Sequence, residues 1–325
     1  MASEREPLRV TYRAAARDAG RRLDLFLKEK IPRMSRERVK QAIRTRVSIA
    51  GRPSPRPSTE LATGDEVIVT MARTESAGQG ALPPPAVSIL HEDADLLAVD
   101  KPAGLLVHGT SSSKGPTLLG ILAERIGGDL HLVHRLDRDT SGVVVLARNP
   151  EAGRTISEAF AGGRVRKRYL AIVFGEVSDD RGAIDLPLGP AAGSAIHIKQ
   201  GVDDASGRPA RTDFRVLERF GDFTLLDVAP RTGRRHQIRV HLQAIGHPVV
   251  GDRLYGARES HHLRFIAGGF DDRMRRELLA ERQLLHAARM EIDHPTGAGR
   301  LRIEAPAPAD MLLFMEARRA GEGGR

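Results

Sequence analysis

Residues 131–149, HLVHRLDRDTSGVVVLARN, decide how the rest of this 325-residue sequence is interpreted. Two apolar segments, residues 131–133 and 143–146, are typical of short buried strands. Between them lies a charged, turn-rich loop that contains Asp137 and Asp139. Because the flanking strands would hold the loop rigidly, its polar side chains would have fixed positions. The pattern predicts an active site in this loop, where one carboxylate could act as a nucleophile.

Outward from this loop, strand-like runs are more frequent than helices. Apolar segments typical of strands occur at residues 96–99, 170–174 and 223–228. One helix is predicted to begin at Pro150 and end at Gly162, and another to span about Arg234 to Ile245. Strands and helices do not alternate strictly, and no glycine-rich phosphate loop follows a strand, which argues against a doubly wound nucleotide-binding fold. The sequence predicts an α+β domain built on a mainly antiparallel, mixed sheet.

Positive charge is concentrated near the N-terminus. The net charge is +9, and residues 1–73 contain 17 Lys and Arg against 9 Asp and Glu, which accounts for +8 of it. A basic module joined to a nearly neutral remainder indicates that one part collects a polyanion while the other acts more selectively. A solubilising arm is the alternative, but loose basic tails rarely have the apolar periodicity of this segment.

The composition divides the chain into four segments. The segments are a basic domain at 1–73 with its core at 21–70, a flexible Pro/Gly linker at 74–86, a catalytic domain at 87–315 and a disordered tail at 316–325. Within the catalytic domain, residues 256–283 form a polar excursion before the sheet resumes.

The basic domain has the pattern of a small α/β module. Three apolar positions have the spacing of one helix: Leu23, Phe26 and Leu27. Ser35 is predicted to cap a second helix. A basic stripe recurs every four residues along that helix: Arg36, Lys40 and Arg44. With short strands at 47–49 and 66–69, the module resembles the alpha-L RNA-binding motif, which implies that the stripe contacts RNA.

Composition excludes several classes of chemistry. The chain has no Cys, which rules out disulfides, cysteine-ligated zinc and thiol nucleophiles and favours a reducing compartment. No stretch approaches the ~20 apolar residues of a membrane span, so a soluble, cytoplasmic protein without membrane partners is expected. The 12 histidines include the pairs His131/His134 and His236/His241, whose spacings do not suit metal ligation. We therefore expect no metal site.

Three motifs in order resemble the RluA-type pseudouridine synthases of ribosomal RNA. The first motif is the HRLD and RDTSG of residues 134–142; the second, RKRYLAIVFGEV, contains Tyr169, and the third, RTGRRHQIRVHL, contains Arg239. Upstream, ILHEDADLLAVDKPAGLLVHGT resembles the opening of that family's catalytic domain. The resemblance extends from about residue 87 to 311 and implies an isomerase without a cofactor that converts uridine to pseudouridine in RNA.

The same resemblance assigns catalytic roles. Asp137 matches the family's catalytic aspartate; spacing alone does not choose it over Asp139. Arg239 is expected to pair with Asp137 and keep it ionised, because burial alone disfavours a charged carboxylate. Tyr169 is expected to stack on uracil. Whether Asp137 attacks the anomeric carbon or takes a proton to start an elimination stays open.

Further residues are expected to contact RNA or the base. Arg135 would fill the space left by a flipped uridine, with a phosphate contact or a structural ion pair as the alternatives. Ile238 would close the base pocket or pack in the core, and His236 lies beside it in the same motif. The basic cluster next to Tyr169 is expected to meet phosphates: Arg166, Lys167 and Arg168.

Large-subunit (23S) ribosomal RNA is the favoured target, and a monomer is the default. A transfer-RNA-directed synthase and a non-catalytic RNA-binding or ribosome-assembly factor are the alternatives. A binding-only relative has no reason to keep Asp137, Tyr169 and Arg239 together, which favours the enzyme. A metal-dependent nucleic-acid hydrolase would need a ligand set that the sequence lacks.

Overall fold

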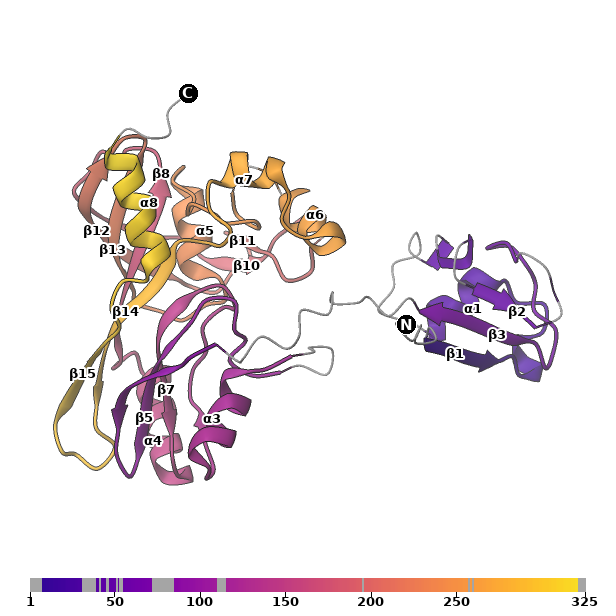
Figure 1. The fold of residues 1–325 in the computed structure, drawn as a ribbon, viewed down its shortest axis with the longest axis horizontal. Helices are drawn as coiled ribbons and strands as arrows, with labels where there is room; N and C mark the ends of the chain where they lie inside the picture. The colour runs from indigo at the N-terminus through magenta and orange to yellow at the C-terminus, as the bar shows by residue number, and fades with distance from the viewer. Residues whose placement is uncertain are drawn as a thin grey trace, which may run out of the picture. The chain divides into compact units, whose positions relative to one another are not determined.

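The computed structural model describes residues 8–30, 39–40, 42–44, 47–50, 52, 55–71, 85–109, 115–194, 196–256, 258 and 260–320 (Figure 1). The chain divides into two compact units, residues 1–82 and 83–325. The boundary falls within the stretch predicted as a linker, most of which lies outside the described residues.

The N-terminal unit is a small sheet packed against helices. Its three antiparallel strands have the order β1 (Leu8–Arg13), β3 (Glu66–Met71) and β2 (Val47–Ile49). A 3-10 turn (Ala16–Asp18) leads to α1 (Leu23–Lys30), and residues 39–40 and 42–44 are also helical. The helix positions identified in the sequence are buried in one core: Leu23, Phe26, Leu27, Val39 and Ile43. Strand β1 was not predicted.

The C-terminal unit is built on one mixed sheet, which confirms the α+β prediction. Among the described residues its main path is β4 (Ser88–Glu92), β5 (Leu96–Lys101), β7 (Ser141–Ala147), β14 (Leu285–Asp293), β8 (Arg166–Phe174), β13 (Phe223–Pro230), β12 (Arg211–Phe220) and β9 (Arg181–Asp185). Strand β15 (Arg300–Glu304) pairs with β14, and β6 (His131–Leu132) pairs with β7. A separate two-stranded sheet contains β10 (Leu188–Pro190) and β11 (Gln200–Val202). All pairings are antiparallel except that of β7 with β14.

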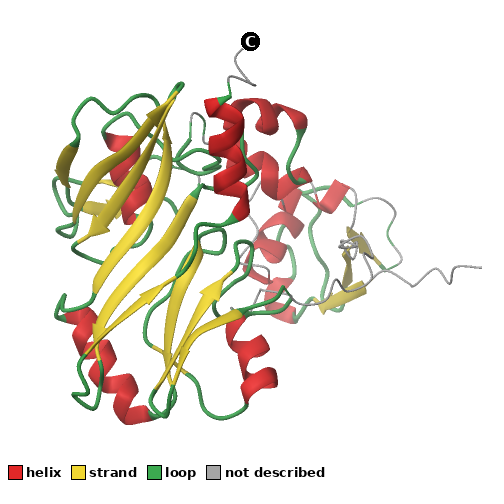
Figure 2. Cartoon of the chain, turned by 60° about the vertical axis from the view of Figure 1, so that its left-hand side comes forward, coloured by secondary structure: helices red, strands yellow, loops and turns green. Residues whose placement is uncertain are grey.

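Helices cover both faces of this sheet (Figure 2). Alternate residues of β7 pack against α3 (Leu118–Ile126) and α4 (Pro150–Ala161), because successive side chains of a strand point to opposite faces. In the other half of the sheet, β8 and β13 pack against α5 (Gln237–Ala244) and α8 (Ala309–Arg319). Tyr169 packs with both the α3 and the α5 clusters and therefore lies where the two halves meet.

Local capping signals locate the helix ends. Asn149 accepts a hydrogen bond from the amide of Ala152 and Pro150 opens α4, which ends before Gly162 as predicted. The excursion at 256–283 contains α6 (Ser260–Gly268) and α7 (Asp272–Leu278).

Three local predictions are wrong. Helix α5 begins at Gln237 instead of about Arg234, because His236 adopts a left-handed conformation that interrupts the helix. The segment predicted as a buried strand at 131–133 is only a two-residue, half-buried strand. Residues 316–319 of the predicted disordered tail continue α8, whose Met311 and Met315 are buried.

The active-site loop leads directly into the parallel contact of β7 with β14. This contact is short, pairing Ser141 with His286 and Gly142 with Ala287. Gly142 has φ of 108°, and a Cβ there would lie 2.3 Å from the Ala287 carbonyl oxygen. Only glycine therefore allows the two halves of the sheet to join at the end of the loop.

We predict that Gly142→Ala lowers the free energy of unfolding by about 3 kcal/mol or more, because backbone strain and overlap with β14 add. Gly246→Ala is the matched control, since its φ of 86° is similar but no atom lies within 4 Å of the added Cβ. Urea unfolding followed by circular dichroism measures both. Equal losses in the two variants would contradict the steric explanation.

Candidate active site

The loop between β6 and β7 is held in place by a backbone hydrogen bond within the loop and by hydrogen bonds from the buried Lys101. The Thr140 amide donates to the Asp137 carbonyl at 3.1 Å, which closes a turn. Lys101, at the buried end of β5, donates its ammonium to the Arg138 carbonyl at 2.9 Å and also to the carbonyls of Pro102 and Leu105. The position of the turn is thus fixed from the neighbouring strand.

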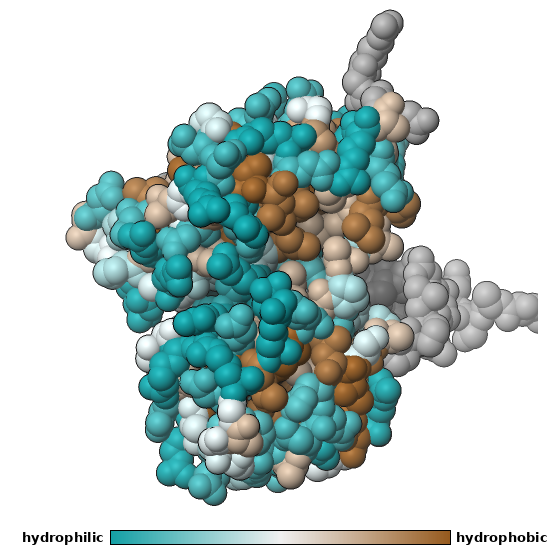
Figure 3. Space-filling view, turned by 90° about the vertical axis from the view of Figure 1, so that its left-hand side faces the viewer, coloured by the Kyte–Doolittle hydropathy of each residue, from teal (hydrophilic) through white to brown (hydrophobic). Residues whose placement is uncertain are grey.

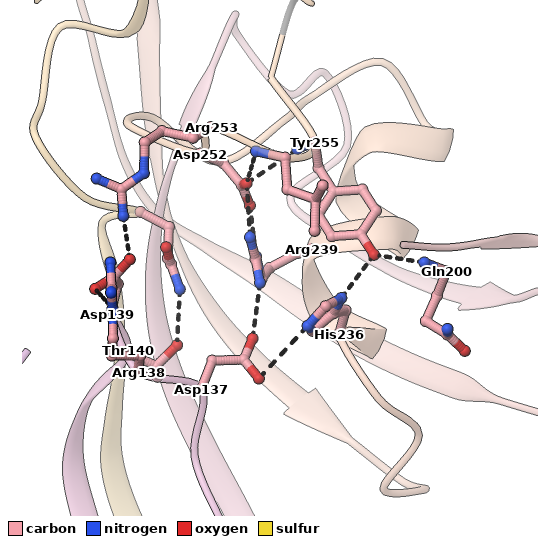
Figure 4. A network of polar contacts seen from close by, with 12 residues as sticks. Asp137, Arg138, Asp139, Thr140, Gln200, His236, Arg239, Asp252, Arg253 and Tyr255 are labelled. Carbon is pink, nitrogen blue, oxygen red and sulfur yellow. Dashed lines mark hydrogen bonds and ion pairs between the residues drawn. The ribbon is translucent and has the colours of Figure 1, made fainter. Parts of the chain in front are cut away.

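Asp137 lies opposite an arginine that two carboxylates share (Figure 4). The Nη1 group of Arg239 donates to Asp137 Oδ2 at 2.8 Å, so the expected pair is present. The remaining edge of the guanidinium binds Asp252 at 2.6 and 2.8 Å in a bidentate pair. Arg239 is 6% exposed, so its guanidinium is buried together with Asp252. Its fork is therefore oriented before any substrate arrives.

Asp252 is the buried anchor of this arrangement. Burial acts to raise the pKa of its carboxyl group, but the Arg239 guanidinium and the amides of Leu254 and Tyr255 outweigh burial and lower it. Burial acts to lower the pKa of Arg239, but Asp252 and then Asp137 raise it above the ordinary value. Asp252 and Arg239 are consequently both charged at neutral pH.

His236 faces the second oxygen of Asp137 as a neutral group. Burial lowers the pKa of its imidazole to about 4, so the 3.8 Å separation between Nε2 and Asp137 Oδ1 is not an ion pair at neutral pH. Tyr255 accepts a hydrogen bond from the Gln200 amide at 2.9 Å and lies 2.8 Å from His236 Nδ1. This arrangement favours a Tyr255 hydroxyl that donates to Nδ1, with the ring proton on Nε2 toward Asp137.

The structure distinguishes the two carboxylates of the loop. Asp139 is bound by Arg138 and Arg253, and it does not line the pocket. Asp137 lines the pocket, and its Oδ1 has no hydrogen bond among the described residues. Asp137 is thus the carboxylate available to a substrate.

A pocket of about 520 Å³ brings most of the predicted catalytic-domain residues together. Those that line it are Arg135, Asp137, Lys167, Tyr169, His236, Ile238 and Arg239. Burial, then the charge of Asp137, raises the pKa of the Tyr169 hydroxyl, so it stays protonated. Ile238 both lines the pocket and packs in the core, so the two readings of this residue are compatible. Arg135 is exposed and has no acidic partner among the described residues.

The remaining predicted basic residues do not join this pocket. Arg166 and Arg168 alternate with Lys167 along β8, so they lie on the opposite face and pair with Glu291 and Asp227. In the N-terminal unit Lys40 is half-exposed and Arg44 is exposed, while Arg36 lies outside the described residues.

The histidines of the motifs have structural partners. His134 accepts a hydrogen bond from the Val145 amide at 2.9 Å and stacks on Phe160. His241 is bonded to Thr212 and to the Leu186 carbonyl. Among the described residues, one group could hold a metal ion, and it lies outside these motifs: Asp93, Asp95 and His294.

Sequence reasoning missed Asp252, Tyr255 and Lys101. The available signals were the charged pair Asp252-Arg253, which follows Val249, Val250 and Gly251, and a lysine at the end of the apolar run of β5. Neither signal specifies a partner, because the contacts join segments more than ten residues apart.

This mixed sheet, with the pocket that Asp137 lines, has the fold of two solved RNA pseudouridylate synthase structures. The human protein RNA pseudouridylate synthase domain containing 1 superposes with a TM-score of 0.56 at 28% identity, over 74% of this chain and 98% of that chain. A second human structure, RNA pseudouridylate synthase domain containing 4, gives 0.55 at 25% identity, over 72% and 93% of the two chains.

Sequence comparison identifies the family. A model described as RNA pseudouridylate synthase matches residues 95–244. An uncharacterized RNA pseudouridine synthase of Chloroflexus aurantiacus is 37% identical over 90% of this chain and 89% of its own length. Ribosomal large subunit pseudouridine synthase D of Xanthomonas campestris is 36% identical over 97% and 95%. The chain belongs to the RluA-type RNA pseudouridine synthase family, and it is an isomerase that acts on RNA. In the part of the chain that the structure describes, no helix is long and apolar enough to cross a membrane.

We predict that acidification below pH 6.5 destabilises the protein partly through His134. Burial lowers the pKa of this imidazole to about 3, so between pH 6.5 and 3 the unfolded chain binds the proton and the folded chain does not. Stability therefore falls with decreasing pH by up to ~1.4 kcal/mol per pH unit from this group. His134→Gln, which keeps an acceptor for Val145, should reduce the slope in urea unfolding between pH 7 and 5; an unchanged slope would contradict the assignment.

Proposed function

We propose that Asp137 is the catalytic carboxylate of a pseudouridine synthase that acts on large-subunit ribosomal RNA. The observation that supports this proposal best is the pair of Asp137 with Arg239, which leaves one carboxylate oxygen directed at the pocket that Tyr169 lines. The names of full-length relatives, such as ribosomal large subunit pseudouridine synthase D, support this class of RNA over transfer RNA.

The reaction requires a carboxylate beside the sugar. Uracil leaves the anomeric carbon through its N1, turns, and returns through C5, which then loses its proton while N1 regains one. Asp137 either attacks the anomeric carbon or removes a ribose proton to begin an elimination. In both routes the Asp137 oxygen that faces the pocket reacts. Uridine and pseudouridine are isomers, so either route regenerates the Asp137 carboxylate at its end.

Arg239 holds the Asp137 carboxylate in a fixed direction and places a positive charge beside it. A partly buried carboxylate tends to take up a proton, and an adjacent fixed cation opposes this tendency. Because Asp252 occupies the other edge of the guanidinium, Arg239 cannot rotate away when Asp137 changes its charge during the reaction.

The pocket walls suit a detached uracil. Tyr169 offers an aromatic face and Ile238 an apolar contact, so a planar base could be retained while it turns. Arg135, exposed at the pocket, has the length and charge to enter the space that a flipped uridine leaves in folded RNA.

The N-terminal unit is proposed to bind RNA. Its sequence carries +8 of the net charge, and helix residues 39–40 and 42–44 present Lys40 and Arg44 away from a closed apolar core. Electrostatic capture by this unit would raise the local concentration of RNA near the catalytic unit. Because its proposed substrate is ribosomal RNA, we expect the enzyme to act in the bacterial cytoplasm.

We predict that Asp137→Asn lowers the single-turnover rate of pseudouridine formation at least about 10⁴-fold, because the amide neither attacks carbon nor accepts a proton. RNA affinity should stay within about threefold. Asp139→Asn is the matched control: it changes a carboxylate in the same turn that faces Arg253 instead of the pocket, and should cost less than about tenfold. Tritium release from 5-tritiated uridine in ribosomal RNA measures the rate. Turnover by Asp137→Asn near the wild-type rate would remove Asp137 from the mechanism.

A further inference from the structure

A second groove lies across the sheet face opposite the Tyr169 ring. It has a volume of about 950 Å³ and runs over strands β14, β8, β13, β12 and β9. Figure 3 views the molecule from the side on which β12 and β15 lie in Figure 1, and shows hydrophilic side chains crossing this face between hydrophobic patches. The charged lining consists of five arginines and three acids: Arg168, Arg181, Arg215, Arg231, Arg289, Asp213, Asp227 and Glu304.

Four of these arginines, Arg168, Arg181, Arg215 and Arg289, form a row that crosses the strands obliquely, here called the arginine row. Arg289 of β14 is the direct cross-strand partner of Arg168 in β8, and Arg215 of β12 is the partner of Arg181 in β9. Asp227 of β13, paired with Arg215, lies between the two arginine pairs. Since neighbouring strands are about 4.8 Å apart, the row from β14 to β9 is about 19 Å long.

The charges of the row are only partly balanced within the protein: Glu304 pairs with Arg289, and Asp227 is shared by Arg168 and Arg215. Like charges directly opposite each other destabilise a sheet, and the row contains two such pairs. A single oxygen of Asp227 accepts from both Arg168 and Arg215 at 3.3 Å, which leaves most N–H donors of both guanidinium groups unused by this carboxylate. Arg181 has no acidic partner among the described residues. The stability of the folded protein alone does not explain why these four arginines lie together.

We infer that the arginine row binds the phosphate backbone of the RNA segment that flanks the target uridine. This inference rests on the proposed function for the identity of the RNA. Arg231 lines both the active-site pocket and the groove, so a strand that leaves the pocket beside Arg231 reaches the row around the end of β13. Guanidinium forks suit phosphate oxygens, and a row of about 19 Å spans several nucleotides of a strand that rises ~3.4 Å per phosphate. The contacts position the RNA and do not read its sequence.

The test removes two charges of the row from the full-length protein. In the double variant Arg181→Gln/Arg215→Gln, Asp227 keeps Arg168 as its partner, so the sheet is preserved. Filter binding to purified bacterial large-subunit ribosomal RNA between 50 and 200 mM KCl should show a Kd raised about tenfold at 100 mM. The slope of log Kd against log salt should decrease by about 1.4, which corresponds to two lost phosphate contacts. The single-turnover rate at saturating RNA should be unchanged.

A matched control removes the same charge elsewhere. Arg275→Gln/Arg319→Gln changes two exposed, ion-paired arginines that line neither pocket. Its Kd should rise less than about twofold. Equal effects of the two double variants, or an unchanged Kd and salt slope in the row variant, would overturn the inference. These outcomes are independent of Asp137→Asn: if that variant is active but the row variant binds RNA weakly, the mechanism fails and the row stands.

Arginine footprinting provides a second measurement that needs no substitution. Phenylglyoxal modification followed by mass spectrometry should show Arg181 and Arg215 protected by the same ribosomal RNA. Arg275 and Arg319 should react at the same rate with and without RNA. Unprotected Arg181 and Arg215 would exclude the row from the RNA contact, and with it the inference.

Discussion

The active site depends on one guanidinium group that is shared by two carboxylates. Asp252 is fully buried and binds one edge of the Arg239 guanidinium, Nε and Nη2, and Arg239 presents its remaining nitrogen, Nη1, to Asp137. Burying the charges of Arg239 and Asp252 would be costly without close pairing and additional hydrogen bonds. Two backbone amides on Asp252 supply those bonds, so the position of Asp137 is fixed through Arg239 by a residue that does not line the pocket.

The fold brings these groups together from distant segments. Asp137 precedes β7, and Arg239 lies on α5. Asp252 follows Val249, which pairs with Val173 of β8. The junction of β7 with β14 is where the two halves of the sheet meet, and Gly142 permits that junction. Lys101 then holds the loop from β5 through the Arg138 carbonyl. Catalytic geometry and the integrity of the sheet are therefore coupled at the same few residues.

Periodicity and local motifs predicted the parts of this protein that local forces determine. The apolar run of β7, the start of α4 at Pro150 and its stop before Gly162 are all confirmed. The start of α5 was wrong, because the left-handed His236 is stabilised by Tyr255, nineteen residues away. Likewise, Asp137 and Asp139 are equivalent in the sequence, and only the positions of Arg239 and Arg253 distinguish them. Non-local contacts of this kind leave no periodic signal.

The single-turnover rate of Asp252→Asn tests the central claim most directly. Asparagine has the shape of aspartate and keeps one acceptor oxygen for Arg239, but it replaces the other acceptor with an NH2 donor and removes the charge that fixes the guanidinium. The account predicts a rate of pseudouridine formation about 100-fold lower at saturating RNA, with an unchanged Kd for RNA and an unchanged circular dichroism spectrum. A folded Asp252→Asn protein that reacts at the wild-type rate would contradict the claim that this buried carboxylate positions the catalytic pair.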